Sequence, residues 1–467
     1  MSPDTTMMRG RVARPGPGRV VATAAFTLAC SALPVFLLGA LAPRISADLG
    51  VDEVAIGGLV AVFFLSGAIC SFPGGVITDR IGSSAALRTG VALAATTAAA
   101  IALLAHSFWI LLLLFVLAGA SVPLADTGGA RAISTGVPLR RQGLAFGGKE
   151  ASIPIASLLA GMMVPILGAQ LGWRPAYALA AALGVLVLIA VPGGLDRFGP
   201  GSSPLGVDRG GGRDRSVADA TASAVPAAAP PSEGDERIHD GAPVRDDGAV
   251  VDAEPEPSLG DHRHGSPEPD RPAASTVVPV SARRALLLLA IASGLAGAAG
   301  NSAPTFLVSS SVATGVSESA AGILLASASV AGILSRLAAG ATADRRGGSE
   351  RRIMGGLMVV GAMGLAAIAV GGPGWTLVGA LLAFGGGWGW TGLAFFAAVR
   401  LLPERPARAA GTILAGLASG GALGPLSFGA LAAGPGYLVA WLCAAGAMLL
   451  AGLLVFQAER VAERGDD

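Results

Sequence analysis

The chain carries twelve apolar runs, each long enough to cross a lipid bilayer. A membrane-spanning helix needs about 20 consecutive apolar residues. Charged residues make up only 13% of the chain, roughly half their usual share in a soluble domain. We therefore predict an all-α integral membrane protein with helices at residues 20–43, 54–75, 86–106, 108–130, 143–168, 174–193, 285–308, 318–340, 353–371, 374–398, 409–431 and 435–456.

The composition inverts between residues 195 and 284, where Pro, Gly, Ser, Asp, Glu and Arg replace the aliphatic residues. Such a segment cannot bury enough apolar surface to offset the entropy of ordering, so we predict a disordered linker. It would separate an N-terminal six-helix bundle, residues 20–194, from a C-terminal one, residues 285–456. Residues 1–19 and 457–467 are then terminal tails.

Arginine is distributed unevenly over the predicted loops. If the N-terminus is cytoplasmic, only Arg44 and Arg174 fall outside, and sixteen arginines fall inside: Arg9, Arg11, Arg14, Arg19, Arg80, Arg88, Arg140, Arg141, Arg345, Arg346, Arg351, Arg352, Arg405, Arg408, Arg460 and Arg464. Cytoplasmic loops carry such an excess of basic residues. Both termini and the linker are therefore predicted to be cytoplasmic, in a bacterial-type plasma membrane.

Four tryptophans agree with this orientation, because each opens a predicted segment at its outer end: Trp109, Trp173, Trp375 and Trp441. An indole ring favours the boundary between acyl chains and head groups. We expect these rings to form an outer aromatic belt.

The two halves repeat the pattern Gly-x-x-x-Asp-Arg-x-Gly at an interval of 265 residues. The first copy is Gly75, Asp79, Arg80 and Gly82; the second is Gly340, Asp344, Arg345 and Gly347. Upstream, Gly50-Val51-x-Glu53-x-x-x-Gly57 repeats as Gly315-Val316-x-Glu318-x-x-x-Gly322 at the same offset. Since each half has an even number of helices, the two copies are parallel repeats related by an axis along the membrane normal.

This repeated octad, placed between helices 2 and 3 and between helices 8 and 9, resembles the diagnostic motif of the major facilitator superfamily. The resemblance implies a transporter that works by alternating access. It also implies that Asp79 and Asp344 engage a helix N-terminus of the opposite half, closing the cytoplasmic side. A carboxylate at a positive helix end contributes about 0.3–1 kcal/mol. Plain capping of the loop is the alternative.

Two glycine-rich matches do not indicate nucleotide binding. Gly143 to Lys149 fits the start of a phosphate-binding loop, but Glu150 stands where a Ser or Thr would hold magnesium. Gly387-x-Gly389-x-x-Gly392 lies within a predicted membrane helix, where glycines permit close packing. We expect no cofactor, no metal ion, no nucleic acid and no enzymatic activity, and we expect a monomer in the lipid bilayer.

Four charged residues fall inside or at the inner ends of predicted helices: Asp126, Lys149, Glu150 and Arg336. A charge at the bilayer centre costs on the order of 3 kcal/mol, so such residues usually face a partner or a cavity. We predict the pairs Lys149–Asp126 and Glu150–Arg336, and we do not expect the adjacent Lys149 and Glu150 to pair with each other.

Lys149, the only lysine of the chain, has three interpretations: a substrate or coupling residue, a structural ion pair, or a side chain that snorkels to the interface. Asp126 and Glu150 are candidate proton carriers. Trp388 and Trp390 on helix 10 and Asn301 on helix 7 are candidate solute contacts. Their alternatives are packed or lipid-facing rings for the tryptophans and an interhelical hydrogen bond for Asn301.

These residues predict a secondary active transporter for a small solute, driven by protons, with an organic anion favoured by Lys149. An exporter of amphipathic compounds that uses Trp388 or Trp390 is the alternative within transport. A transporter-like receptor or regulator is the alternative from another class, although it would not need the Asp79 and Asp344 motif.

Overall fold

A computed structural model of the protein describes residues 15–138, 141–195, 280–345, 350–402 and 406–463. These residues are almost entirely helical, with no strand in the part that the structure describes, and they belong to one compact unit. The predicted linker at 195–284 lies almost wholly outside the described residues, as does most of the N-terminal tail; most of the C-terminal tail is described and belongs to α16. The all-α prediction is confirmed.

The N-terminal half runs from α1 to α9. Its helices are α1 (Pro17–Ala40), α2 (Ala42–Leu49), α3 (Glu53–Ile81), α4 (Ser83–Leu104), α5 (Phe108–Gly136), α6 (Gln142–Glu150), α7 (Ser152–Met163), the π-helix Val164–Gly168, α8 (Ala169–Leu171) and α9 (Arg174–Ala190). The segment predicted as a single helix 5 is therefore three α-helices and a π-turn in line.

The C-terminal half runs from α10 to α16. Its helices are α10 (Val280–Ala313), α11 (Glu318–Arg345), α12 (Glu350–Val370), α13 (Pro373–Gly389), α14 (Thr391–Leu401), α15 (Pro406–Ala433) and α16 (Tyr437–Glu463). Helix 7 begins at Val280 and helix 12 ends at Glu463, so the predicted bundle limits 285 and 456 were too narrow. Predicted helix 10 is divided between α13 and α14.

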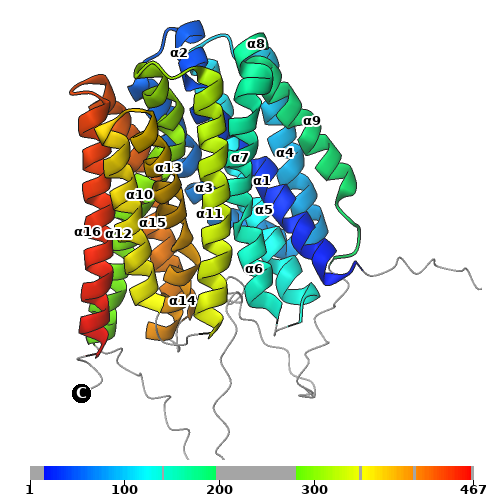
Figure 1. The fold of residues 1–467 in the computed structure, drawn as a ribbon. Coiled ribbons are helices and arrows are strands. Elements are labelled where there is room, and N and C mark those ends of the chain that lie inside the picture. Colours follow the sequence, from blue (N-terminus) through cyan, green and yellow to red (C-terminus); the bar gives the residue numbers. More distant parts are fainter. Residues whose placement is uncertain (1–14, 139–140, 196–279, 346–349, 403–405, 464–467) are drawn as a thin grey trace, which may run out of the picture. The chain divides into compact units, whose positions relative to one another are not determined.

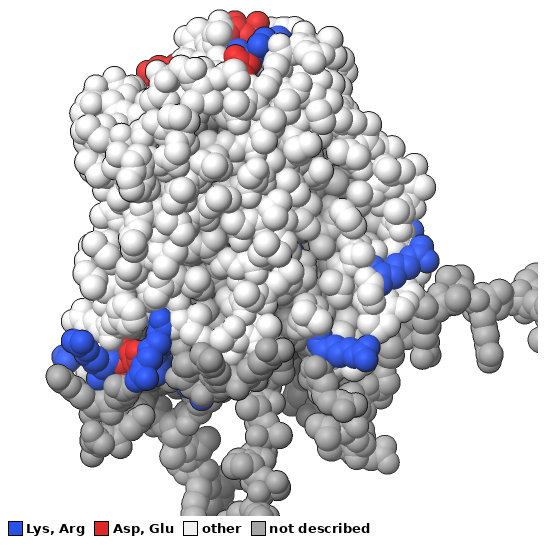
Figure 2. All heavy atoms as spheres, in the orientation of Figure 1, with Lys and Arg blue, Asp and Glu red and all other residues white. Residues whose placement is uncertain are grey.

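Eleven helical segments of the described chain are long and apolar enough to span a membrane, and α9 is a shorter apolar helix. Large apolar side chains lie on the surface of these segments; Phe72, for example, is 79% exposed. Such a surface needs lipid around it. On the face in Figure 2, charged side chains gather toward the two ends, and a broad uncharged band lies between them. The protein is thus a multi-pass membrane protein.

Figure 1 shows the end that carries α2 opposite the end at which α1 begins and α16 ends. We call these the α2 end and the terminal end. Of the four tryptophans predicted for the aromatic belt at the α2 end, Trp109 and Trp375 are exposed. Trp173 and Trp441 are buried, so the prediction was wrong for these two. The Trp173 indole bonds Asp48, whereas Trp441 packs on Phe428, 4.7 Å between ring centroids.

At the α2 end the two halves interlock through the upstream repeat. A Cβ at Gly57 of α3 would collide with the backbone of Pro425 on α15, and one at Gly322 of α11 would collide with Gly161 on α7. Both glycines therefore allow helices of opposite halves to touch backbone to backbone. The repeat encodes one contact twice, related by the internal symmetry.

The repeated glutamates also cross between halves. Glu318 at the start of α11 accepts from Arg44 of α2 at 2.6 Å, and Glu53 at the start of α3 accepts from Tyr437 of α16 at 3.2 Å. The preceding glycines Gly50 and Gly315 have φ of 64° and 91°, a region that favours glycine. Each copy of the repeat thus supplies a turn, a polar contact and a packing contact.

Asp48 of α2 also anchors this end. It accepts from the Trp173 indole at 3.1 Å and from the Arg174 guanidinium at 2.8 Å. The Trp173 hydrogen bond, followed by the hydrogen bond and charge of Arg174, holds the pKa of the Asp48 carboxyl below its ordinary value. Asp48 therefore stays ionised and ties α2 to the start of α9.

Candidate functional site

Lys149, near the end of α6, is a buried charged residue. Its side chain is 5% exposed, and its Nζ lies 2.5 Å from Asp126 Oδ1 on α5 and 3.2 Å from Glu150 Oε1. The predicted Lys149–Asp126 pair is present, and the snorkelling interpretation is wrong. The prediction that Lys149 and Glu150 do not pair is also wrong, because both side chains are long enough to meet although their helix positions diverge.

The two carboxylates differ from the ammonium in their access to solvent. The Asp126 side chain is 46% exposed and that of Glu150 is 41% exposed. A buried cation needs a counter-charge, and breaking such a pair from one side is strongly destabilising. Two partly exposed carboxylates, those of Asp126 and Glu150, therefore stabilise the buried ammonium group of Lys149.

Small residues on the neighbouring helices make room for the lysine. Gly129 of α5 faces Ala24 of α1, and a Cβ at Gly129 would lie 3.0 Å from the Ala24 Cβ and 3.6 Å from Lys149 Cδ. The lysine stem thus packs where α1, α5 and α6 meet. Counting 1.5 Å per residue from Gln142, Lys149 lies about 10 Å along its membrane segment from the terminal end.

Arg336 of α11 connects this cluster to the other half. Its Nη1 donates to the backbone carbonyl of Glu150, and its Nε donates to the backbone carbonyl of Trp388 at 3.0 Å. The predicted contact between Arg336 and Glu150 is therefore made to the main chain, whereas the Glu150 carboxylate contacts Lys149.

Both of these carbonyls lie at interrupted helices. Glu150 is the last residue of α6, immediately before the break at Ala151, and Trp388 is the second-last residue of α13, before the break at Trp390. The last carbonyls of a helix have no partner within it. Arg336 supplies a partner to the ends of two broken helices, one in each half.

The tryptophans predicted as solute contacts are both buried. Trp388 donates from its indole to the Gly300 carbonyl of α10 at 3.1 Å, and its ring meets Phe36 of α1 edge-on, 5.9 Å between centroids. Trp390 donates to the Gly387 carbonyl of its own segment at 2.6 Å. Each ring is packed against protein, and Trp388 adds a second contact between the halves.

Among the described residues, the side chain of Asn301 bonds within its own helix and not to another helix, which was its alternative. Its side-chain nitrogen donates to the carbonyl of Gly297, one turn earlier in α10, at 2.8 Å. The side chain is half-buried, so its role as a solute contact stays a prediction.

The first copy of the octad closes within its own half. Asp79 pairs with Arg131 at the end of α5, at 2.6 Å, and Gly82 provides the turn between α3 and α4 with a φ of 84°. Gly75 is buried and Arg80 is exposed. In the second copy Gly340 is exposed, but the side chains of Asp344 and Arg345, and all of Gly347, lie outside the described residues. The gating role across halves stays a prediction.

Sequence reasoning missed Arg131 and its counterpart Arg400, which pairs with Glu350 at 2.5 Å. A signal was available, because each arginine follows closely on a predicted helix, number 4 or number 10, at matching places in the two halves. Each joins the end of that helix to the loop region carrying the octad.

The charges at Lys149 and Arg336 are not repeated between the halves. Ser71, the position equivalent to Arg336, donates to Gly67 of its own helix at 2.8 Å, and Thr412, in the stretch equivalent to Lys149, donates to Arg408 at 2.8 Å. Neither counterpart makes a contact between halves through its hydroxyl. Asp126, Lys149, Glu150 and Arg336 are called the charged cluster below. The cluster lies where α6 of one half meets α11 of the other, and the equivalent positions of the repeat carry Ser71 and the Thr412 stretch.

The apolar helical bundle and its internal repeat define a membrane transport protein. The model of the Major Facilitator Superfamily matches residues 24–399, and the chain belongs to this family. The comparison with curated proteins gave no match.

Solved structures share the fold. A bacterial homologue of the human lysosomal transporter Spinster, inward-facing and unoccupied, matches with a TM-score of 0.63 and 14% identity, over 97% of this chain and 99% of that one. Its occupied inward-facing form gives a TM-score of 0.59 at 14% identity, over 97% of each chain. The nucleoside transporter NupG gives 0.61 at 13% identity, over 95% and 98%. Identities this low support the fold alone.

Proposed function

We propose that this transporter couples the movement of a small organic anion to protons through the charged cluster. The observation that carries the proposal is the buried Lys149 ammonium held between two half-exposed carboxylates. In this state the lysine is fully compensated and has no need of an anion. The four side chains Lys149, Arg336, Asp126 and Glu150 together carry no net charge. Protonation of Asp126 or Glu150 leaves one uncompensated positive charge, and a carboxylate of the solute can then replace the lost partner.

Binding and protonation are thereby linked in one direction. A proton that neutralises Asp126 leaves Lys149 with Glu150 alone and the group of Lys149, Arg336, Asp126 and Glu150 with one net positive charge, which is costly where it is buried. An anion that arrives at Lys149 recovers the lost interaction. Proton and anion consequently favour each other's binding, as linkage requires. This is the thermodynamic basis of symport.

Arg336 would connect this event to the movement of the halves. Its two hydrogen bonds join the end of α6 to the end of α13, so a rocking motion must break at least one of them. Helices α5 and α14 pack mainly on helices of their own half. The contacts that join the two halves at the α2 end are made by α2, α3 and α11. With the terminal end cytoplasmic, as the arginine distribution predicts, the two carboxylates would be reached from the cytoplasm.

The test is thermal stabilisation of the purified protein by a panel of carboxylates, amino acids, sugars and amphipathic cations at acid and neutral pH. We expect a carboxylate to stabilise the wild type at acid pH, to act less at neutral pH, and to have no effect on Lys149→Ala. Asp126→Asn, which mimics the protonated acid, should bind the same carboxylate equally at both pH values. Binding raises stability by RT ln(1 + [L]/Kd).

Equal stabilisation of wild type and Lys149→Ala by cations or apolar compounds would contradict the anion proposal and favour the exporter of amphipathic compounds. Burial of both Trp388 and Trp390 leaves that alternative without its expected aromatic surface in this conformation.

A further inference from the structure

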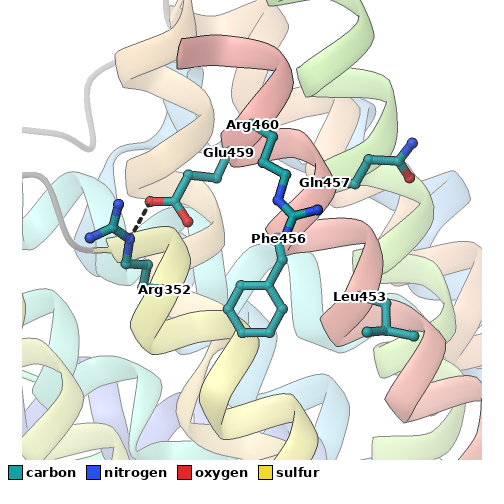
Figure 3. A pocket seen from close by; sticks show the side chains of 6 residues that line it. All are labelled: Arg352, Leu453, Phe456, Gln457, Glu459 and Arg460. Carbon is teal, nitrogen blue, oxygen red and sulfur yellow. Dashed lines mark ion pairs between the residues drawn. The ribbon is translucent and has the colours of Figure 1, made fainter. Parts of the chain in front are cut away.

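A groove lies between the terminal ends of α12 and α16, far along the chain from the charged cluster. It has a volume of about 660 Å³ and is lined by Arg352, Leu453, Phe456, Gln457, Glu459 and Arg460. In Figure 3, Arg352 comes from α12 and the other five side chains come from α16, with the Glu459 carboxylate between the two arginines and the Phe456 ring below them.

Close packing of the two helices shapes the groove. A Cβ at Gly355 of α12 would collide with the Phe456 ring, and one at Gly452 of α16 would lie 3.2 Å from the Gly355 carbonyl oxygen. The tip of the Phe456 ring therefore packs against the backbone of α12, and the ring forms an apolar floor. Leu453 extends this floor toward the apolar band and is half exposed.

Two guanidinium groups are exposed at the groove. Glu459 is buried and accepts from Arg352 Nε at 2.9 Å, which fixes the guanidinium at the groove mouth. Arg352 itself is 68% exposed, and Arg460 is exposed as well. Both guanidinium groups can therefore be reached by an anion from outside the protein.

The geometry points to a binding site for an anionic phospholipid of the leaflet at the terminal end. The phosphate would be bound by the exposed guanidinium groups of Arg352 and Arg460, since guanidinium groups bind phosphate oxygens with good geometry. One acyl chain would follow Phe456 and Leu453 toward the bilayer centre; Leu453 is two helical turns from Arg460, about 10 Å. Basic pockets between membrane helices bind anionic head groups in this way.

A second groove on the same end provides a matched control. It lies between α1 and α9, is smaller at about 220 Å³, and is lined by Arg19, Ala22, Thr23, Phe26, Val187 and Ala190. It combines one arginine with an apolar floor but lacks the second cation. Arg19→Gln removes one surface charge at the same end without touching the α12–α16 groove.

The experiment compares the full-length protein with Arg352→Gln/Arg460→Gln and with Arg19→Gln. Native mass spectrometry counts retained phosphatidylglycerol, and thermal unfolding in detergent is followed with added phosphatidylglycerol or phosphatidylcholine. We expect the wild type and Arg19→Gln to retain phosphatidylglycerol and to gain stability from it, and the double variant to lose both effects. Phosphatidylcholine should leave all three unchanged.

Retention of phosphatidylglycerol by the double variant at the wild-type level would overturn the proposal. So would an equal loss in Arg19→Gln, because the effect would then reflect surface charge in general. Glycerol 3-phosphate in place of the lipid should give no shift; an equal shift would show that the site binds free phosphate compounds. If the double variant does not fold, Arg460→Gln alone is measured, and an unchanged lipid count in it would count against the site.

Discussion

The contacts between halves at the α2 end and the charged cluster at the terminal end are built on opposite principles. At the α2 end one sequence pattern is used twice, and Gly57 and Gly322 make equivalent backbone contacts between halves. At the terminal end Lys149 and Arg336 have only Ser71 and the Thr412 stretch as counterparts, and these hydroxyls bond within their own helices. Symmetric packing closes one end, and asymmetric charge occupies the other.

Under the proposed function, this difference separates the scaffold from the residues that couple proton and solute. Two parallel repeats can share a closure contact, because the internal axis carries each copy onto the other. A single proton and a single solute need only one set of charged groups. The duplicated end should therefore respond to changes in packing, and the unique end to changes in charge.

The largest effect on stability is expected from Asp126→Asn. It leaves the buried Lys149 ammonium with Glu150 alone, and loss of one partner of a buried pair costs about 3 kcal/mol. Lys149→Met should cost less, because the acids it leaves behind are half-exposed and can be hydrated. Unfolding of both variants in detergent at neutral pH measures the order; the reverse order would contradict the assignment of Lys149 as the buried charge.

Gly57→Ala should have the next largest effect. The added Cβ overlaps the Pro425 backbone, and overpacking of this kind costs about 2 kcal/mol. The neighbouring Gly58→Ala is the matched control, since a Cβ there meets nothing within 4 Å; it should gain about 0.5 kcal/mol from helix propensity. Equal thermal midpoints for the two variants would show that α3 and α15 do not touch at this point.

Glu318→Gln should have a smaller effect, below about 1 kcal/mol, because its ion pair with Arg44 is partly exposed. Its repeat counterpart Glu53→Gln should also be mild, since it alters one hydrogen bond from Tyr437. Thermal unfolding at low and high salt distinguishes them: salt should weaken the Arg44 contribution and leave that of Tyr437 unchanged. A large, salt-independent loss in Glu318→Gln would contradict the partly exposed ion pair.

The smallest effect concerns Asp48 and acid pH. Its folded-state pKa is lowered by the Trp173 and Arg174 contacts, so its contribution is complete above its unfolded pKa of about 3.9 and is lost as pH falls through the lower folded value. Asp48→Asn should remove this part of the acid-side decline in stability. Unfolding midpoints measured from neutral to strongly acid pH test this; parallel pH profiles for variant and wild type would contradict it.

The amino-acid sequence by itself determined the membrane helices, the duplication and the candidate residues of the charged cluster. Apolar length is a local property, because a bilayer requires each spanning segment to be apolar in its own right. The 265-residue repeat likewise needed no coordinates. The Lys149–Asp126 pair followed from the cost of intramembrane charge, which leaves few acceptable partners.

Only the tertiary structure decided how those residues are connected. The breaks at Ala151 and Trp390, the use of the Glu150 and Trp388 carbonyls by Arg336, and the burial of Trp173 and Trp441 depend on helices distant in sequence. A free carbonyl at a helix end accepts from whichever donor packing brings near it, and periodicity contains no information about that donor. Spacing along one helix also could not show that Lys149 would reach both acids, because the direction of a long side chain is set by the room that Gly129 and Ala24 leave for it.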